Sequence, residues 1–334
     1  MMRTTLLSFL LLIAIVFQSC FKEDEMVSPH QRGDIMTDTI PMTVNYLYQV
    51  YFSLDSGKIV SANVKTLYDL GFECSQTGWQ VILNTSDFMK VADLGEVPFG
   101  QAYDTVGLTM LFDKSDGNPD SNAIGQWFKI SGADTVSNKH VYALTRGLDE
   151  LGNPLGLYQV IFDSLKNNMY HFRYAPILGG TISYGAITKD PEVNYVFFSL
   201  KSGSAISMEP PSNTYDLLFT QYTTMLYTNE GIPYPYLVTG ALLNRYMVEA
   251  AVDSTTDFLA ITREKAMMMS FSRALDVIGY DWKYYDDKTG NYTIIPNRSY
   301  VIRGVSDFLF KLRFVDFYNK EGLKGYPVIE YQRL

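Results

Sequence analysis

Short apolar runs recur along most of the chain, and Gly, Pro, Asn, Asp or Ser residues separate them. Residues 157–162 and 308–317 are two such runs, each of strand length. The 25 tyrosines and 20 phenylalanines reinforce this pattern, because aromatic side chains favour strands and give them large packing faces. The pattern predicts an all-β fold, mainly of antiparallel strands.

Two halves of the chain carry the same motifs in the same order. The sequence YFSLDSG at 51–57 matches FFSLKSG at 197–203, and YDLGF at 68–72 matches YDLLF at 215–219. Further on, YALTRG at 142–147 matches YVIRG at 300–304. A Ser-Gly pair after an aromatic run is typical of a hairpin turn. We therefore predict a tandem duplication, with one β domain over residues 42–187 and a second over 188–334.

One segment of the second half favours a helix. Residues 257–275 contain good helix formers, and Thr262 is a suitable start for about three turns. Three consecutive methionines, Met267 to Met269, lie in this segment, and methionines at such a place usually fill a core.

The N-terminal residues predict a secreted lipoprotein. An apolar run at 6–17 follows Arg3 and ends in Gln18-Ser19-Cys20, which resembles a lipobox, although Phe17 is bulkier than usual there. The run is too short for a permanent membrane span. We expect a signal peptide at 1–19, diacylation of Cys20 by palmitate-type chains, and a flexible tether at 20–41. A buried helix that precedes a cysteine is the alternative.

The tether also bears on localisation. Lys22 followed by acidic residues resembles the surface-export signal of lipoproteins from the Gram-negative group related to Bacteroides. This favours an outer-membrane lipoprotein exposed on the cell surface, whereas a plain solvated linker needs no such signal.

Charge and cysteine content exclude several classes of function. The net charge of −9 argues against nucleic acid as a partner. If Cys20 is a thioether, Cys74 has no cysteine left to pair with, so we expect a small buried side chain there.

The sequence gives no support for catalysis. Only His30, His140 and His171 are present, and no Gly-x-Ser-x-Gly elbow accompanies them. Asp69 and Asp216 recur in the repeat and are more simply backbone-capping residues than a glycosidase pair. The acidic stretch 113–120 resembles a calcium loop but lacks the closing glutamate, since residue 124 is Ile. We predict a protein that is not an enzyme.

The second half resembles the HmuY family of haem-binding lipoproteins. The motif YDLLF at 215–219 is similar to the family's W-D-x-x-F strand, and KLRF at 311–314, GYP at 325–327 and EY at 330–331 are similar to its closing strands. The resemblance covers about residues 190–334, and residues 42–180 are a more divergent copy. It implies an antiparallel β fold that holds haem between loops, a role in haem acquisition, and a TonB-dependent receptor as a partner.

The candidate ligand residues depart from the family pattern. Where the family has a ligand after the W-D-x-x-F strand, this chain has Thr220 and Gln221. Without histidine in the second half, Met225 and Met247 are the candidate haem and metal ligands, with Tyr222 as a weaker alternative. Both methionines could instead be core residues. Two alternatives stay open: a surface binding or adhesion protein that has lost haem ligation, and a hydrolase that uses His171 or the paired acids.

Overall fold

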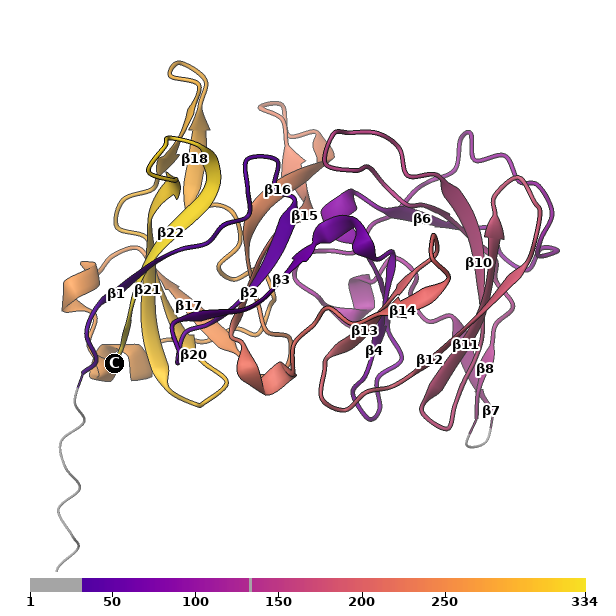
Figure 1. Cartoon of the computed structure of the whole chain (residues 1–334), viewed down its shortest axis with the longest axis horizontal. Coiled ribbons are helices and arrows are strands. Elements are labelled where there is room, and N and C mark those ends of the chain that lie inside the picture. The colour runs from indigo at the N-terminus through magenta and orange to yellow at the C-terminus, as the bar shows by residue number, and fades with distance from the viewer. Residues whose placement is uncertain (1–31, 132–133) are drawn as a thin grey trace, which may run out of the picture. The chain divides into compact units, whose positions relative to one another are not determined.

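The computed structural model describes residues 32–131 and 134–334, and residues 33–334 form one compact unit. The expected signal peptide and the expected lipidation site, Cys20, lie outside the described residues. Every strand pair in the described chain is antiparallel, and the one α-helix described, α2 (Arg263–Met267), lies in the second half. The predicted all-β fold with a short helix is therefore confirmed (Figure 1).

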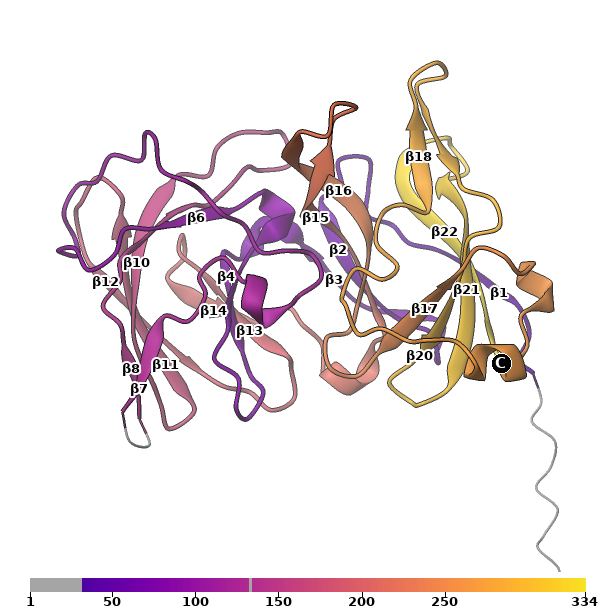
Figure 2. The same ribbon diagram turned by 180° about the vertical axis from the view of Figure 1, so that it is seen from behind.

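Three sheets make up the part of the molecule that contains the C-terminus. A five-stranded sheet has the order β1 (Met36–Thr39), β22 (Lys324–Arg333), β21 (Leu309–Tyr318), β20 (Ser299–Arg303) and β17 (Glu249–Asp253). A four-stranded sheet has the order β16 (Pro233–Leu243), β15 (Leu217–Tyr227), β2 (Tyr48–Ser53) and β3 (Lys58–Val64). The hairpin of β18 (Lys283–Asp286) and β19 (Asn291–Ile294) projects beside them (Figure 2).

Two further sheets form the other part. The larger has the order β12 (Ser183–Thr188), β11 (Met169–Pro176), β10 (Leu157–Lys166), β8 (Asp134–Ser137) and β7 (Phe128–Ser131), while β9 (Tyr142–Thr145) pairs with both β10 and β6 (Lys90–Asp93). The smaller has the order β14 (Ser204–Ile206), β13 (Tyr195–Ser199), β4 (Leu70–Glu73) and β5 (Val81–Leu83). Single 3-10 turns complete the described chain: η1 (Lys65–Leu67), η2 (Thr85–Asp87), η3 (Pro119–Ser121), η4 (Ser212–Thr214) and η5 (Phe258–Ala260).

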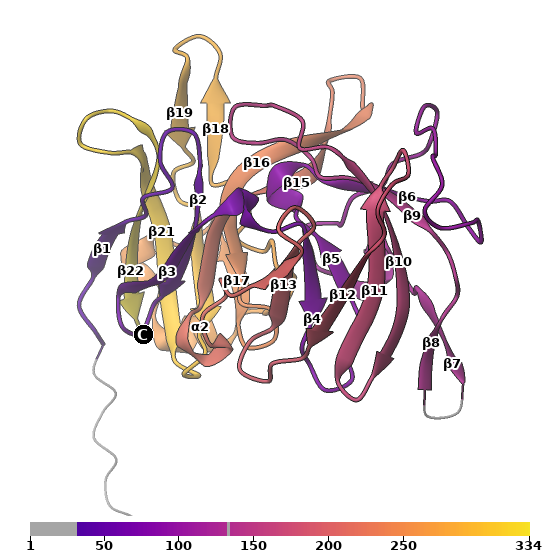
Figure 3. The same cartoon turned by 45° about the vertical axis from the view of Figure 1, so that its right-hand side comes forward.

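The two copies of the repeat exchange their first hairpins. β2, from the first copy, pairs with β15 of the second so that Phe52 lies opposite Leu217. β13, from the second copy, pairs with β4 of the first so that Phe198 lies opposite Leu70. Figure 3 shows each hairpin beside strands of the other copy. We call the part built on β4–β12 with β13–β14 the first lobe, and the part built on β15–β22 with β1–β3 the second lobe.

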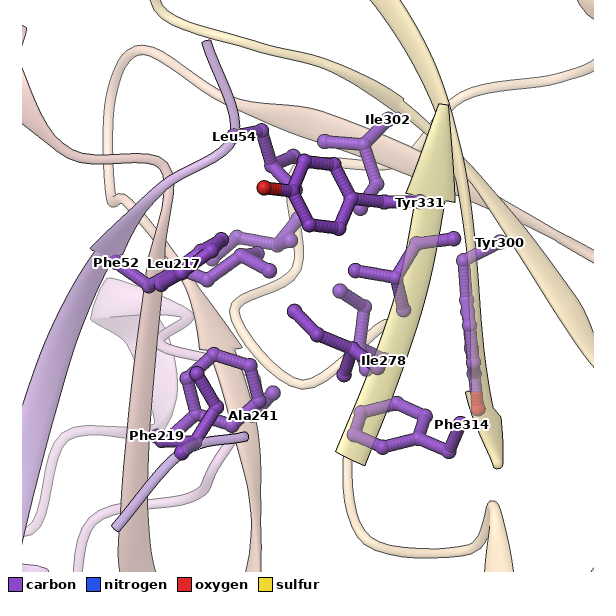
Figure 4. Packing of buried hydrophobic residues seen from close by; sticks show 14 of the residues in the cluster. Phe52, Leu54, Leu217, Phe219, Ala241, Ile278, Tyr300, Ile302, Phe314 and Tyr331 are labelled. Atoms are coloured by element: carbon purple, nitrogen blue, oxygen red, sulfur yellow. The ribbon is translucent and has the colours of Figure 1, made fainter. Parts of the chain in front are cut away.

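The hydrophobic cores follow the lobes rather than the sequence halves. The core of the second lobe buries Val50, Phe52 and Leu54 among residues such as Phe219 and Tyr331 (Figure 4). In the same way, the core of the first lobe takes Phe198 and Leu200 from the second copy. The expected domain boundary at 187/188 separates the two copies in the sequence, whereas each hydrophobic core draws residues from both copies.

Equivalent carboxylates hold the exchanged hairpins. Asp216 accepts hydrogen bonds from the backbone N–H of Leu54 at 2.7 Å and of Val305 at 2.8 Å. Asp69 accepts one from the N–H of Leu200 at 2.6 Å, and its other oxygen pairs with Arg146 at 2.7 Å. Both acids therefore bind backbone in the way that the sequence suggested.

The helix is shorter than the sequence predicts. Thr262 caps α2 as expected, by accepting a hydrogen bond from the N–H of Lys265, but the helix ends at Met267 instead of after three turns. Only Ala266 is fully buried in it, so packing stabilises little more than one turn. Met267 and Met268 are 62% and 79% exposed, so the prediction that the three methionines fill a core was wrong for these two. Met269 is partly buried and packs against a small hydrophobic cluster, as predicted.

Cys74 matches its prediction. It is buried, and burial raises the pKa of its thiol. Among the described residues, no helix is both long and apolar enough to cross a membrane.

Candidate functional site

Met225 lies near the tip of the hairpin formed by β15 and β16. Its side chain is 40% exposed, and Met225 pairs with Pro235 on β16. Side chains two residues apart share one face of a strand, so Met225 and Tyr227, which is 66% exposed, lie on the same face. The tip thus presents a thioether and an aromatic ring to solvent.

Met247 lies at the opposite end of the same hairpin. It belongs to a tight turn that the N–H of Val248 closes by donating to the carbonyl of Asn244, and Asn244 is bonded to Asp216 beside the start of β15. From Asp216 to Met225 the strand rises nine residues, or about 30 Å. The structure therefore does not bring Met225 and Met247 together, and these two side chains cannot coordinate the same iron.

The residues between them are less accessible. Tyr222 is 1% exposed, and its hydroxyl has no hydrogen-bond partner. Burial raises the pKa of this tyrosine far above its usual value, so the phenol stays protonated. Thr220 is buried, and the side-chain oxygen of Gln221 accepts a hydrogen bond from Lys65 at 2.8 Å. None of the three presents a free ligand atom at the surface.

A cavity of about 140 Å³ lies where the two lobes meet. Residues at equivalent positions of the two copies line it in pairs: Tyr51 with Phe197, Tyr68 with Tyr215, and Leu83 with Leu243. The cavity is therefore a product of the duplication, because each copy supplies a similar wall.

Charged side chains also line this cavity. Asp113 accepts hydrogen bonds from the N–H groups of Leu83 and Ala123 at 2.6 and 2.7 Å, and burial raises its pKa to about 6. Glu209 binds the side chains of Asn194 and Tyr215, and burial raises its pKa to about 7. Both carboxylates thus hold neighbouring loops and strands in place.

Arg245 and Lys114 are the cations that line the cavity, and Arg245 is the more buried of the two. Its terminal nitrogens donate to the carbonyl of Gly117 and to the side-chain oxygen of Gln80, both at 2.7 Å. These partners are neutral, and neighbouring tyrosines together with Glu73 raise the pKa of Arg245 despite the opposing effect of burial. The guanidinium therefore keeps its full charge inside the cavity wall.

The remaining candidates for chemistry are dispersed. His140 contacts Asp93 at 2.7 Å on an exposed surface, and His171 is an exposed residue of β11. In the described ranges, no group of three or more His, Cys, Asp or Glu side chains is placed to hold a metal ion. Asp113, the first acid of the stretch that resembles a calcium loop, uses both oxygens on backbone.

Comparison with known proteins finds likeness only among solved structures. No protein family and no curated protein matches the chain. It is similar to the apo HmuY analogue of Tannerella forsythia, at 9% identity and a TM-score of 0.27, over 92% of this chain and 98% of that one. Apo PinO from Porphyromonas gingivitis shares 9% identity with this chain at a TM-score of 0.29, over 91% of this chain and 98% of that one.

A third similar structure is a candidate HmuY-like heme-binding protein from Bacteroides vulgatus. It shares 15% identity with a TM-score of 0.16, over 52% of this chain and 90% of that one.

Sequence reasoning missed the cavity. Its charged residues come from three distant segments that share no motif: Asp113 with Lys114, Glu209, and Arg245. The only sequence signal was the repeat itself, which predicts that equivalent aromatic residues such as Tyr68 and Tyr215 occupy equivalent places.

Proposed function

We propose that the chain is a surface-anchored lipoprotein, attached to the outer membrane through Cys20, that binds a small-molecule ligand without catalysis. The ligand is haem, and the protein serves nutrient acquisition with a TonB-dependent receptor as its partner. Supporting this are the lipobox-like sequence, the HmuY-like motifs, and solved structures of HmuY type among the similar proteins.

Met225 carries the proposal. It lies on β15, the strand whose first residues resemble W-D-x-x-F, it is exposed, and it shares its strand face with the ring of Tyr227. A thioether is a soft neutral donor that suits ferrous haem iron, and an aromatic ring can pack on the porphyrin. Because Met247 lies beyond the opposite end of the hairpin, beside the start of β15, Met225 is the single protein ligand in this proposal.

The experiment is a titration of the full chain with reduced haem, followed by its Soret band. We expect a narrow band that saturates at one haem per chain. Met225→Ala should weaken binding at least tenfold, because the axial ligand is lost. Met247→Ala is the matched control, since Met247 is equally exposed at 39%, and it should leave the titration unchanged.

The alternative is a binding or adhesion protein that has lost haem ligation. The separation of the two methionines favours it, because the pair of soft ligands expected from the sequence does not form at one iron. Broad absorbance that never saturates, and that is equal in both variants, would establish this alternative.

A further inference from the structure

The size of the cavity between the lobes restricts what can fill it. Cavities of about 150 Å³ accept a single benzene ring, and this cavity measures about 140 Å³. Drug-sized ligands occupy roughly 300–1,000 Å³, so the cavity suits a much smaller molecule than haem. Its aromatic walls, which include Tyr51, Tyr68 and Phe197, suit a flat ring.

Two lining tyrosines carry unused hydrogen-bonding groups. The hydroxyl groups of Tyr195 and Tyr222 are buried and have no partner, although the two residues are only 7% and 1% exposed. A buried polar group without a partner destabilises a protein, and native structures retain few of them. Unpaired hydroxyl groups beside a cavity are therefore available to a ligand.

Arg245 supplies a positive charge, and the two acids whose charges act on it, Glu73 and Asp113, bind backbone N–H groups. Its terminal nitrogens bind neutral oxygens, its Nε is buried without a hydrogen-bond partner, and no carboxylate of the described chain forms an ion pair with it. The guanidinium lies 5.9 Å from the ring centroid of Tyr195. A carboxylate matches such a group, because its two oxygens can accept several N–H and O–H donors at once.

We propose that the cavity between the lobes is a second binding site, for a planar aromatic carboxylate of about the size of benzoate. Arg245 binds the carboxylate, the hydroxyl of Tyr195 donates to it, and the ring packs between the aromatic walls that the two copies of the repeat supply. This site is separate from Met225 and does not depend on haem binding.

Calorimetric titration of the full chain in detergent micelles tests the proposal, with benzoate as the probe and benzamide as its neutral isostere. Benzoate should bind at one per chain, and benzamide at least tenfold more weakly, because only the anion matches Arg245. Arg245→Gln should weaken benzoate binding at least tenfold, whereas Met268→Ala, on the exposed part of the helix segment, should not change it.

Tyr195→Phe gives a second signature. It should weaken benzoate binding about fivefold and raise the melting temperature of the free protein, because it removes a buried hydroxyl without a partner. If Tyr195 had only a structural role, its replacement would not weaken benzoate binding while raising the melting temperature. Saturating haem should leave benzoate binding unchanged, which distinguishes this site from the haem site.

Three results would overturn the proposal: no saturable benzoate binding by the unaltered chain, equal affinity for benzoate and benzamide, or benzoate affinity unchanged in Tyr195→Phe. If Arg245→Gln fails to fold, the comparison of benzoate with benzamide and the Tyr195→Phe variant still test the proposal.

Discussion

At the scale of single residues, this protein buries charges that most folds expose. Lys283 is an example: its ammonium donates to the carbonyl of Thr239 at 2.6 Å and lies 4.0 Å from the ring centroid of Trp282. Burial lowers the pKa of Lys283 to about 7, whereas Asp281 opposes this shift only partly. The side chain therefore changes charge near neutral pH.

Lys283 should make stability depend on pH. Its pKa is lower in the folded state than in the unfolded state, so the unfolded chain binds more protons between pH 7 and 10.5. Stability from this residue should rise with pH from 7 upward, by at most about 1.4 kcal/mol per pH unit. Urea unfolding from pH 7 to 9 should show this slope as the difference between the unaltered chain and Lys283→Met. Parallel curves would show that Lys283 does not titrate there.

At the scale of elements, the sequence predicts where a strand lies better than which strand it pairs with. The motifs YFSLDSG and FFSLKSG correctly indicate hairpins, which are β2–β3 and β13–β14. Turn chemistry specifies such local pairs, because the two strands are adjacent in the chain. The pairing of Phe52 with Leu217 joins residues far apart, and no local pattern encodes which of two similar sheets a hairpin joins. The exchange of hairpins was therefore invisible in the sequence.

The same limit applies to the candidate site. Met225 could be chosen from its distance after YDLLF, and the structure places it at an exposed tip. The sequence could not show that Met225 and Met247 lie apart. The two residues are separated by the length of the β15–β16 hairpin, which depends on how the strands pair. The sequence therefore suggests which side chains could act as ligands, but not the distance between them in the folded protein.

The acids that hold the exchanged hairpins give a test at this scale. Asp216→Asn replaces one acceptor oxygen by an amide nitrogen that faces a backbone N–H. We expect it to lower the free energy of unfolding by about 2 kcal/mol. Asp69→Asn should cost more, about 3–5 kcal/mol, because it also leaves the buried Arg146 without its carboxylate. Urea unfolding measures both. Asp55→Asn, in an exposed turn, is the control and should change stability by less than about 0.5 kcal/mol. Equal effects at Asp55 and Asp216 would contradict the holding role.

At the scale of the whole molecule, the first lobe behaves as an insertion into the second. The chain leaves the second lobe after β3 and returns before η4, and the side chain of Asn63 donates to the carbonyl of Met208 at 2.9 Å. The points of exit and return are therefore adjacent. Excising residues 65–207 should need only a short linker, because insertions are tolerated where their ends lie close together.

We expect residues 33–64 joined to 208–334 by a short Gly-Ser linker to fold, and residues 188–334 alone to fail. The shorter fragment lacks five buried apolar residues of the core of the second lobe, namely Ile40, Met42, Val50, Phe52 and Leu54. Losing a large buried side chain costs roughly 2–5 kcal/mol, so their joint loss exceeds the stability of an ordinary domain. Thermal unfolding followed by near-ultraviolet circular dichroism should show a cooperative transition only for the joined fragment. A cooperative transition in residues 188–334 alone would mean that the second copy can close its core with its own hairpin, β13–β14, in place of β2–β3.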